Sequence, residues 1–294
     1  MSRAEWIAAD WGTTRLRVWG MRGTEPLWRD ASDRGMGALA PHEFEGALGA
    51  LLGERAGPPV IACGMVGARQ GWVEAPYAAV PCAPLGDPVR APGSLDVRVL
   101  PGLSQASPPD VMRGEETQIA GLLAEAPRFD GVAVLPGTHT KWARLSAGEV
   151  VSFRTAMTGE LFALLAERSV LRHSVGAEEA AEETGTAFAE AVADALARPE
   201  ALAVSLFGVR AASLLQGTPP AAARARLSGL LIGAELAALR PYWLGQEVAV
   251  IADGGLARAY REALAAQGCP VRGWSAEALT LAGLSAAHRR LEAS

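Results

Sequence analysis

The stretch EWIAADWGTTRLRVW, residues 5–19, decides the fold, because it predicts two β-strands joined by a tight link. Residues 5–10 are apolar up to a terminal carboxylate, Asp10, while residues 15–21 alternate between arginine and apolar side chains. Such alternation is typical of a half-buried strand. The short link between them contains a glycine and two threonines. We therefore expect a hairpin, which residues 26–30 extend to a meander of three strands.

The same pattern begins again at Gly131. Residues 132–135, 141–145 and 150–155 predict a second three-stranded meander, and a Gly-Thr link again joins its first two strands. A helix and a further buried strand follow each meander. The repetition predicts a duplicated α/β fold whose cleft lies between the two halves.

Apolar side chains at helical spacing predict the helices of both halves. They are expected at residues 41–54, 110–124, 158–171, 178–196, 201–215, 221–239, just after 255, and at 276–291. Short buried strands are expected at 60–63 and 247–252. The proline-rich stretch 76–109, in which only 95–100 resembles a strand, is interpreted as an insertion. We expect lobes at 1–127 and 128–294, with the last helix a candidate to cross back to the first lobe.

Composition narrows the class of protein. The chain has 294 residues, of which 50% are hydrophobic and 20% charged, enough for one large core or two medium ones. A net charge of −5 predicts neither a nucleic-acid partner nor an anionic membrane, so a small molecule is the expected partner. No apolar run approaches the roughly 20 residues of a membrane span, and no signal peptide is recognised. Cys63, Cys82 and Cys269 fit neither a disulfide framework nor a zinc site, which favours a cytoplasmic enzyme.

The link after the first strand has the groups needed to bind a metal-bound phosphate. Asp10 ends a buried strand, Gly12 allows the backbone to turn closely, and Thr13 and Thr14 supply hydroxyls. These groups could hold hydrated Mg²⁺ and donate hydrogen bonds to phosphate oxygens. An ordinary hairpin with an Asx-type turn explains the same residues equally well when the link is taken alone.

The corresponding link of the second copy, LPGTHTK at 135–141, contains the chain's single lysine, Lys141, whereas all other cationic side chains are arginine. A lysine ammonium is a compact charge that can follow a transferring phosphoryl group, while arginine favours fixed bidentate geometry. Chance survival of one lysine is the alternative. Gly137, Thr138 and Thr140 are the other candidates in this link for contacts with phosphate.

A third glycine-containing loop, Asp253-Gly254-Gly255, follows the strand expected at 247–252. Paired glycines at such a point let the backbone pass close to an adenine ring or an α-phosphate, although a plain strand-to-helix turn has the same composition. The P-loop and dinucleotide-binding signatures are missing. Three loops in this order, each after a strand, predict a nucleotide site of another kind.

Six longer strings of the sequence are specific enough to compare with a known family. They are DWGTT (10–14), GMVGARQGW (64–72), MRGEETQ (112–118), LPGTHTKW (135–142), MTGELF (157–162) and SGLLIGAE (228–235). Together they resemble the 2-keto-3-deoxygalactonate kinase family, within the superfamily of actin, hexokinase and Hsp70. The resemblance implies two duplicated actin-like (ribonuclease H-like) ATPase lobes with a cleft between them. It also implies transfer of phosphate from ATP, with Mg²⁺, to the C6 hydroxyl of a sugar acid, 2-keto-3-deoxygalactonate.

The resemblance also implies roles in catalysis. Asp10 is expected to bind Mg²⁺, and because Pro136 stands where the superfamily usually has an acidic residue, the metal depends on Asp10 alone among these loops. Lys141 is expected to contact the phosphates. Glu115 and Glu116 are the candidates for the catalytic base, because related exopolyphosphatases place a catalytic glutamate on a similar segment. The alternative is that they are ordinary first-turn residues of a helix, and the choice between the two glutamates stays open.

A substrate carboxylate calls for an arginine partner. Arg69 with Gln70 in the glycine-rich loop, and Arg113 just before the two glutamates, are the candidates. Thr158 and Glu160 could complete the sugar pocket, although a helix N-cap explains Thr158 equally well. Trp72 and Trp142 could either stack on substrate or fill the core.

Two other functions are consistent with the same residues. The first is a kinase for another sugar acid or a polyol, because the fold determines the ATP chemistry while a few loop residues determine the substrate. The second is a non-catalytic, nucleotide-dependent sensor whose closure is read by a partner. Asp10, Lys141 and the pair of glutamates favour an enzyme over a sensor. No feature of the sequence predicts an oligomeric state.

Overall fold

The computed structural model describes residues 3–176 and 185–293, and the chain divides into two units. The first unit comprises Met1–Asp130, Leu145–Phe153 and Ser275–Ser294. The second comprises Gly131–Arg144 and Arg154–Trp274. None of the helices in the described residues has the length and apolar character that a membrane span needs.

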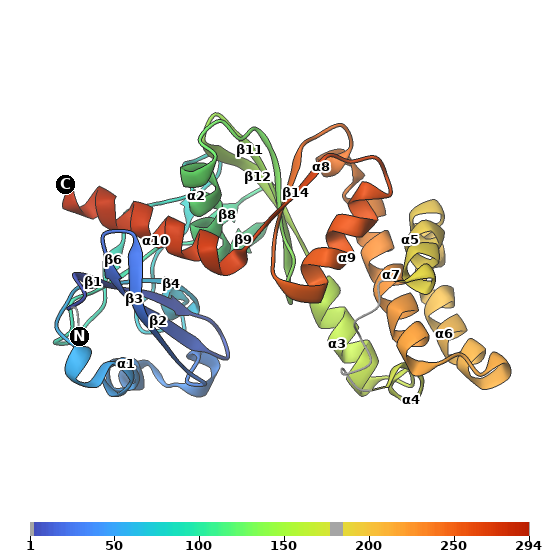
Figure 1. The fold of residues 1–294 in the computed structure, drawn as a ribbon, viewed down its shortest axis with the longest axis horizontal. Helices are drawn as coiled ribbons and strands as arrows, with labels where there is room; N and C mark the ends of the chain where they lie inside the picture. Colours follow the sequence, from blue (N-terminus) through green and yellow to red (C-terminus); the bar gives the residue numbers. More distant parts are fainter. Residues whose placement is uncertain (1–2, 177–184, 294) are drawn as a thin grey trace. The chain divides into compact units, whose positions relative to one another are not determined.

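The first unit is built on a six-stranded sheet (Figure 1). Its strands are β1 (Trp6–Trp11), β2 (Leu16–Arg22), β3 (Glu25–Ser32), β4 (Val60–Gly64), β6 (Val89–Arg90) and β7 (Val97–Val99). They lie in the order β3-β2-β1-β4-β7-β6, with β1 antiparallel to β2 and parallel to β4, which is itself parallel to β7. A small second sheet contains β5 (Ala78–Ala79), β8 (Leu103–Gln105) and β9 (Asp110–Met112).

The two faces of this sheet are covered by different helices. Alternate residues of a strand point to opposite faces, so Ile7 and Ala9 pack with α1 (Phe44–Leu52), whereas Trp6 and Ala8 pack with α10 (Ala276–Glu292). A second helix, α2 (Glu115–Glu125), lies against α10. The alternation places Asp10 on the same face as α10.

The second unit repeats the topology of the first. Its sheet is formed by β10 (Gly131–Leu135), β11 (Thr140–Ser146), β12 (Glu149–Ala156), β13 (Val248–Ile251) and β14 (Val271–Trp274). The adjoining ends of β11 and β12 fall within Leu145–Phe153, which is grouped with the first unit. The order β12-β11-β10-β13-β14 matches β3-β2-β1-β4-β7. In the second sheet β10 is parallel to β13 and β13 to β14, just as β1 is parallel to β4 and β4 to β7 in the first. The duplicated α/β fold predicted from the two meanders is therefore confirmed.

The helices of the second unit cover its sheet and extend beyond it. They are α3 (Thr158–Arg168), α4 (Arg172–Val175), α5 (Thr186–Ala197), α6 (Leu202–Gln216), α7 (Pro220–Ala238), α8 (Arg240–Trp243) and α9 (Gly254–Ala265). Helices α5 and α7 approach closely, because a Cβ at Gly229 or Gly233 would lie 2.5 or 2.6 Å from a carbonyl oxygen of α5. Two glycines of the SGLLIGAE string thus fix the position of α7.

Several elements differ from the sequence prediction, and the short elements β5, β6, β8, β9, α4 and α8 were not predicted. Helix α2 starts five residues later than expected, because residues 110–112 form β9 and Gly114, with a φ of 106°, is the residue that directly precedes the helix. Strand β7 belongs to the central sheet, although the stretch around it was interpreted as an insertion. Strand β14 was not predicted, since its four residues include Arg272 and Gly273. The start of the helix expected at 178–196 falls partly on 177–184, outside the described residues, and α5 begins at Thr186.

Candidate functional site

The link between β1 and β2 is held in a fixed shape by backbone hydrogen bonds. The Gly12 amide donates to the Arg15 carbonyl at 2.8 Å, and the amide of Gly37 donates to the Thr13 carbonyl at 2.8 Å. Thr13 and Thr14 are both exposed. The link therefore presents two hydroxyls to solvent from a rigid turn, as binding of a phosphate requires.

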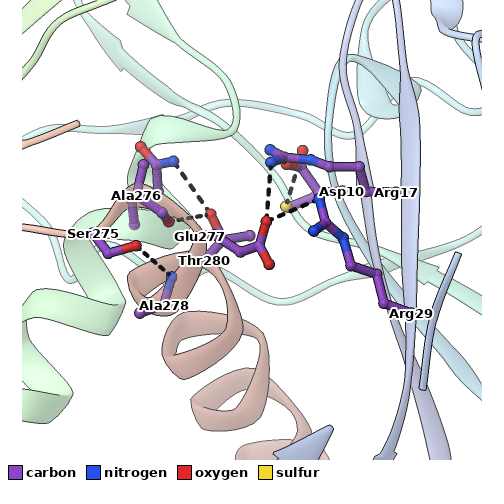
Figure 2. A network of polar contacts seen from close by, with 10 residues as sticks. Asp10, Arg17, Arg29, Ser275, Ala276, Glu277, Ala278 and Thr280 are labelled. Carbon is purple, nitrogen blue, oxygen red and sulfur yellow. Dashed lines mark hydrogen bonds and ion pairs between the residues drawn. The ribbon is translucent and has the colours of Figure 1, made fainter. Parts of the chain in front are cut away.

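Asp10 lies beside this link in a network of charged groups (Figure 2). Arg17, directly opposite it on β2, donates a hydrogen bond to its Oδ2. Glu277, in the first turn of α10, lies 3.7 Å from Nη1 of Arg17 and 3.1 Å from Nη2 of Arg29. Only 16% of the Asp10 side chain is exposed. The Arg17 guanidinium thus pairs with both carboxylates, and Arg29 pairs with Glu277.

The electrostatics of Asp10 reflect its partial burial. Desolvation raises the pKa of Asp10, the charge and hydrogen bond of Arg17 oppose that rise, and the Glu277 carboxylate adds to it. Arg17 thereby keeps an anion stable in a poorly solvated position. A divalent cation bound at Asp10 would, like Arg17, stabilise the ionised carboxylate and lower its pKa.

The two glutamates at the start of α2 have different environments. Glu116 is fully buried; its Oε2 accepts a hydrogen bond from the Gly114 amide at 2.6 Å, and its Oε1 accepts one from the Thr117 hydroxyl at 3.0 Å. Desolvation, with a contribution from the Glu115 charge, raises the pKa of Glu116 to about 8. Glu115 is half-buried and accepts from the Arg113 amide at 3.0 Å. Both candidates for the base keep the positions at the helix start that the sequence predicted.

The raised pKa of Glu116 predicts a pH dependence of folding stability. Between about pH 5 and pH 8 the folded state keeps a proton that the unfolded state releases, so the free energy of unfolding falls as pH rises through this window. In Glu116→Gln this contribution, on the order of a few kcal/mol, disappears. Urea denaturation of both proteins at pH 5, 6.5 and 8 measures the difference. Parallel stability curves for the two proteins would contradict the prediction.

Arg113 lies beneath the glycine-rich loop of the same unit. Its Nη2 donates to the Ala75 carbonyl at 2.8 Å, and its guanidinium stacks over the Tyr77 ring at 4.3 Å. Nε and Nη1 are buried, and no hydrogen-bond partner for them is found among the described residues. A Cβ at Gly67 would come within 2.8 Å of Nη1, so glycine is needed there. Two unpaired donors on a fixed guanidinium are what an anionic ligand needs.

The tip of the same loop is open to solvent. Arg69 and Gln70 are both exposed. Trp72, two residues further on, is only 7% exposed and packs edge-on against Trp11 in the core. Of the two roles considered for Trp72, the structure favours packing.

In the second unit, the link between β10 and β11 is tied to the start of α3. The Glu160 amide donates to the Thr138 carbonyl at 2.9 Å, and Nε2 of His139 lies 2.5 Å from Oε2 of Glu160. Gly137 is half-buried and Thr138 is exposed. Thr140 is fully buried, with its hydroxyl 3.0 Å from that of Tyr260. The structure therefore leaves the first part of this link accessible and turns Thr140 inward.

Lys141 is 6% exposed, and its Nζ donates to the Thr155 hydroxyl of β12 at 2.8 Å. The adjacent Trp142 is fully buried, and its indole N–H donates to Glu235 Oε1 at 2.6 Å, which favours a structural role for this tryptophan. A buried ammonium on a central strand has little conformational freedom. Lys141 is accordingly held in one place by the sheet.

A largely apolar pocket opens beside this link, entirely within the second unit. Its lining comes from the link, α3, α7 and α9, and consists of Gly137, Thr158, Gly159, Phe162, Ser228, Leu231, Ile232, Leu256 and Tyr260. Thr158 does not cap α3, because Met157 occupies that position and Thr158 donates its hydroxyl proton to Glu235 instead. Thr158 and the SGLLIGAE string thus meet at one pocket.

The loop Asp253-Gly254-Gly255 forms the start of α9, and all three residues are exposed. Gly254 has a φ of 66°, which favours glycine. A Cβ added at Gly255 or at Gly137 would meet no atom within 4 Å. No residue that the structure describes fills the space beside these two glycines, so a ligand could approach the backbone there.

Four residues of these sites were not among the sequence candidates: Arg17, Glu277, Thr155 and Tyr260. Arg17 could have been identified from the sequence, because a hairpin with a short link places it opposite Asp10. Glu277, Thr155 and Tyr260 could not, since they reach the sites only through the tertiary fold. The part of the chain that the structure describes contains no group of three or more histidine, cysteine or acidic residues arranged to hold a metal.

Comparisons with known proteins identify the family of the chain. The family model described as 2-keto-3-deoxy-galactonokinase matches residues 10–287. The chain is 41% identical to the Rhizobium meliloti (strain 1021) protein named "Probable 2-dehydro-3-deoxygalactonokinase DgoK1", with 97% of each chain covered. It is 36% identical to the 2-dehydro-3-deoxygalactonokinase of Escherichia coli (strain K12), covering 97% of this chain and 98% of that one.

The fold agrees as well. A crystal structure from Sinorhizobium meliloti, of a protein assigned as a 2-dehydro-3-deoxygalactonokinase, matches with a TM-score of 0.90 and 40% identity, covering 97% of this chain and 99% of that chain. The predicted fold class, two actin-like ATPase lobes, is confirmed. The relatives carry the names of kinases that act on a sugar acid. With a match that spans all three predicted loops, the chain belongs to the 2-keto-3-deoxy-galactonokinase family.

Proposed function

We propose that this chain transfers the γ-phosphoryl group of ATP to the C6 hydroxyl of 2-dehydro-3-deoxy-D-galactonate, in galactonate breakdown. The observation that carries the proposal is the family match over residues 10–287, which includes every candidate site residue. Full-length relatives named for this activity support it. A cytoplasmic location is part of the proposal and is consistent with the three free cysteines, Cys63, Cys82 and Cys269.

The pocket of the second unit suits an adenine nucleotide. Its walls are mostly apolar, as the flat face of a base requires, and Gly137 and Gly255 leave open space beside the backbone. The start of α9, with its free amides, lies at residues 254–255, where a phosphate or ribose would be favoured. Asp253, Gly254 and Gly255 would therefore hold the nucleoside, while Thr13, Thr14 and Thr138 would contact the phosphates.

Asp10 is the residue that would hold Mg²⁺. This ion usually keeps several waters and is bound by one or two carboxylates together with substrate phosphates, so a single carboxylate in a fixed position fits it. When bound, the ion neutralises charge on the phosphates. Arg17 already forms a hydrogen bond to Asp10 and would have to share it or move toward Glu277, 3.7 Å away.

The reaction forms a bond between the substrate oxygen and the γ-phosphorus and breaks the bond to the bridging oxygen of ADP. The substrate hydroxyl gives its proton to a base, for which Glu115 and Glu116 are the candidates. A base with a pKa of about 8, as Glu116 has, would make the rate rise up to that pH. Glu115 is the more accessible of the two in the structure. Lys141 would stabilise the negative charge on the phosphoryl group as it transfers.

Arg113 is proposed to bind the carboxylate of the sugar acid through its unpaired Nε and Nη1. In Arg113→Lys we expect the KM for the sugar acid to rise at least about tenfold, because one charge-assisted pair contributes roughly 1.5–3 kcal/mol. The KM for ATP should change less than about twofold, since Arg113 is not among the residues proposed to contact the nucleotide or its metal. Steady-state kinetics with each substrate varied in turn measures both constants.

The matched control is Arg98→Lys, another arginine of the first unit, whose guanidinium pairs with Asp96 at 3.3 Å. It should leave both KM values unchanged. Equal losses for ATP and sugar acid in Arg113→Lys, or no loss in either, would show that Arg113 does not bind the carboxylate.

The proposed function is tested by measuring ADP release with ATP and Mg²⁺ over a panel of acceptors. The panel contains 2-dehydro-3-deoxygalactonate, its C4 epimer, other aldonic acids and a polyol. Turnover of the galactonate-derived acid above all others is the expected result. Brisk turnover of another member alone would reject the specific substrate and keep the kinase. ADP binding without turnover of any acceptor would instead indicate a sensor.

A further inference from the structure

Glu235 is a buried carboxylate of α7 to which the mechanism above assigns no role. It is 5% exposed, yet three donors from three other elements converge on it. The Trp142 indole N–H donates to Oε1 at 2.6 Å, the Tyr260 hydroxyl donates to Oε2 at 2.8 Å, and the Thr158 hydroxyl also donates to Oε2. A single side chain thus connects α7 with β11, α3 and α9.

Stability of the fold alone gives no reason for a carboxylate at this position. Burial raises the pKa of Glu235, and the three hydrogen bonds oppose that rise, while no cation is among the causes found within the described chain. Replacing buried charged groups with apolar residues of similar volume is often neutral or stabilising. The carboxylate at position 235 is therefore better explained by the roles of the three residues that donate hydrogen bonds to it.

Two of these partners form walls of the nucleotide pocket. Thr158 lines it from α3 and Tyr260 from α9. Tyr260 is also 3.0 Å from the Thr140 hydroxyl, and because Tyr260 gives its own proton to Glu235, Thr140 donates to Tyr260. Thr140 directly precedes Lys141 in β11. The hydrogen bonds thus run from Thr140, at the end of the link between β10 and β11, through Tyr260 to Glu235, and all three residues belong to the second unit.

We propose that Glu235 is a positioning residue for the nucleotide: it fixes Thr158, Tyr260 and, through Tyr260, the link that ends at Lys141 in the geometry that binds ATP. The inference rests on the proposed function, because it assigns the pocket to the nucleotide. Glu235 itself touches neither substrate nor phosphate. Its effect is exerted through the orientation of the two hydroxyl groups on the pocket walls.

Glu235→Gln is the informative substitution, because it preserves the size of the side chain and exchanges one acceptor oxygen, with the negative charge, for a donor NH₂ group. A glutamine offers one acceptor oxygen and an NH₂ group, whereas the site supplies three donors. The Trp142 indole N–H can only donate a hydrogen bond, so the amide oxygen of the glutamine must remain its acceptor. The Thr158 and Tyr260 hydroxyls must then accept from the NH₂ group, which reverses the hydrogen bond between Tyr260 and Thr140.

The experiment measures the Kd for ADP by calorimetry and the KM values for ATP and the sugar acid on the full chain. In Glu235→Gln we expect the Kd for ADP and the KM for ATP to rise about tenfold, while the KM for the sugar acid changes less than twofold. In Tyr260→Phe the Kd for ADP and the KM for ATP should rise by a smaller factor. The double variant should lose less than the product of the two single effects, since both act through one hydrogen bond.

Leu236→Val is the matched control, because Leu236 is the next residue of α7, fully buried in the sheet-facing core and outside the pocket lining. It should lower the melting temperature and leave the Kd for ADP unchanged. Equal ADP affinity in Glu235→Gln and in the unmodified protein would overturn the positioning role and leave the proposed function intact. Failure of the unmodified protein to bind ADP would overturn both.

Discussion

Replacing Lys141 with methionine lowers kcat for phosphoryl transfer by about 10²–10³-fold, the loss typical of removing one group that stabilises transition-state charge. Methionine fills most of the space of the lysine stem, so the packing on β11 is preserved. The melting temperature should fall little or rise, because a 6% exposed ammonium is costly to bury. Steady-state ADP release and thermal unfolding measure the two effects separately.

Two further variants separate charge from geometry at this position. Lys141→Arg keeps the positive charge but changes its shape, and we expect kcat to recover only in part. Thr155→Val removes the hydroxyl that accepts from Nζ at 2.8 Å and should lower kcat by less than about tenfold. A methionine variant that retains more than a tenth of the kcat would show that Lys141 does not act on the phosphoryl group.

Replacing Asp10 with asparagine should lower kcat by about 10²–10³-fold and raise the Mg²⁺ concentration needed for half-maximal rate. The carboxylate is the anionic ligand expected for the ion, and an amide is a much weaker one. The amide oxygen can still accept the hydrogen bond of Arg17, so the hairpin should stay intact. Rates measured over a range of Mg²⁺ concentrations, together with circular dichroism, test both expectations.

The control for this experiment is Asp33→Asn. Asp33 pairs with Arg15 near the same link at 3.3 Å, but its side chain is 90% exposed. We expect no change in kcat and none in the Mg²⁺ dependence. If Asp10→Asn lowered the rate without shifting the Mg²⁺ dependence, the assignment of Asp10 to the metal would be wrong.

Much of the fold could be predicted from local patterns, because each pattern reports on burial along one element. The arginine and apolar side chains that alternate in residues 15–18 predicted β2, in which Leu16 and Val18 pack into the core beside α1. Strand β14 gave no such signal: it is short and mostly exposed or half-exposed along its length. The start of α2 depended on the backbone of Gly114, whose left-handed φ a periodicity argument does not detect.

The candidate site divides in the same way. Asp10, near the end of β1, and Gly255, at the start of α9, could be proposed as site residues because each belongs to a short contiguous stretch with a recognisable composition. Arg113 was proposed from its neighbours alone, and the structure adds the unpaired donors that support the role. Glu235 was part of a recognised string, but its function depends on partners 77 and 93 residues away in the chain, which no local pattern can indicate.

The position of α10 has a consequence for biosynthesis. Trp6, Ala8 and Trp19 are covered by a helix that leaves the ribosome only after the whole second unit has been made. At translation rates of roughly 5–20 residues per second, that delay is on the order of ten seconds. During this time a nascent chain exposes an apolar sheet face, so the N-terminal half should depend on chaperones until the last helix emerges.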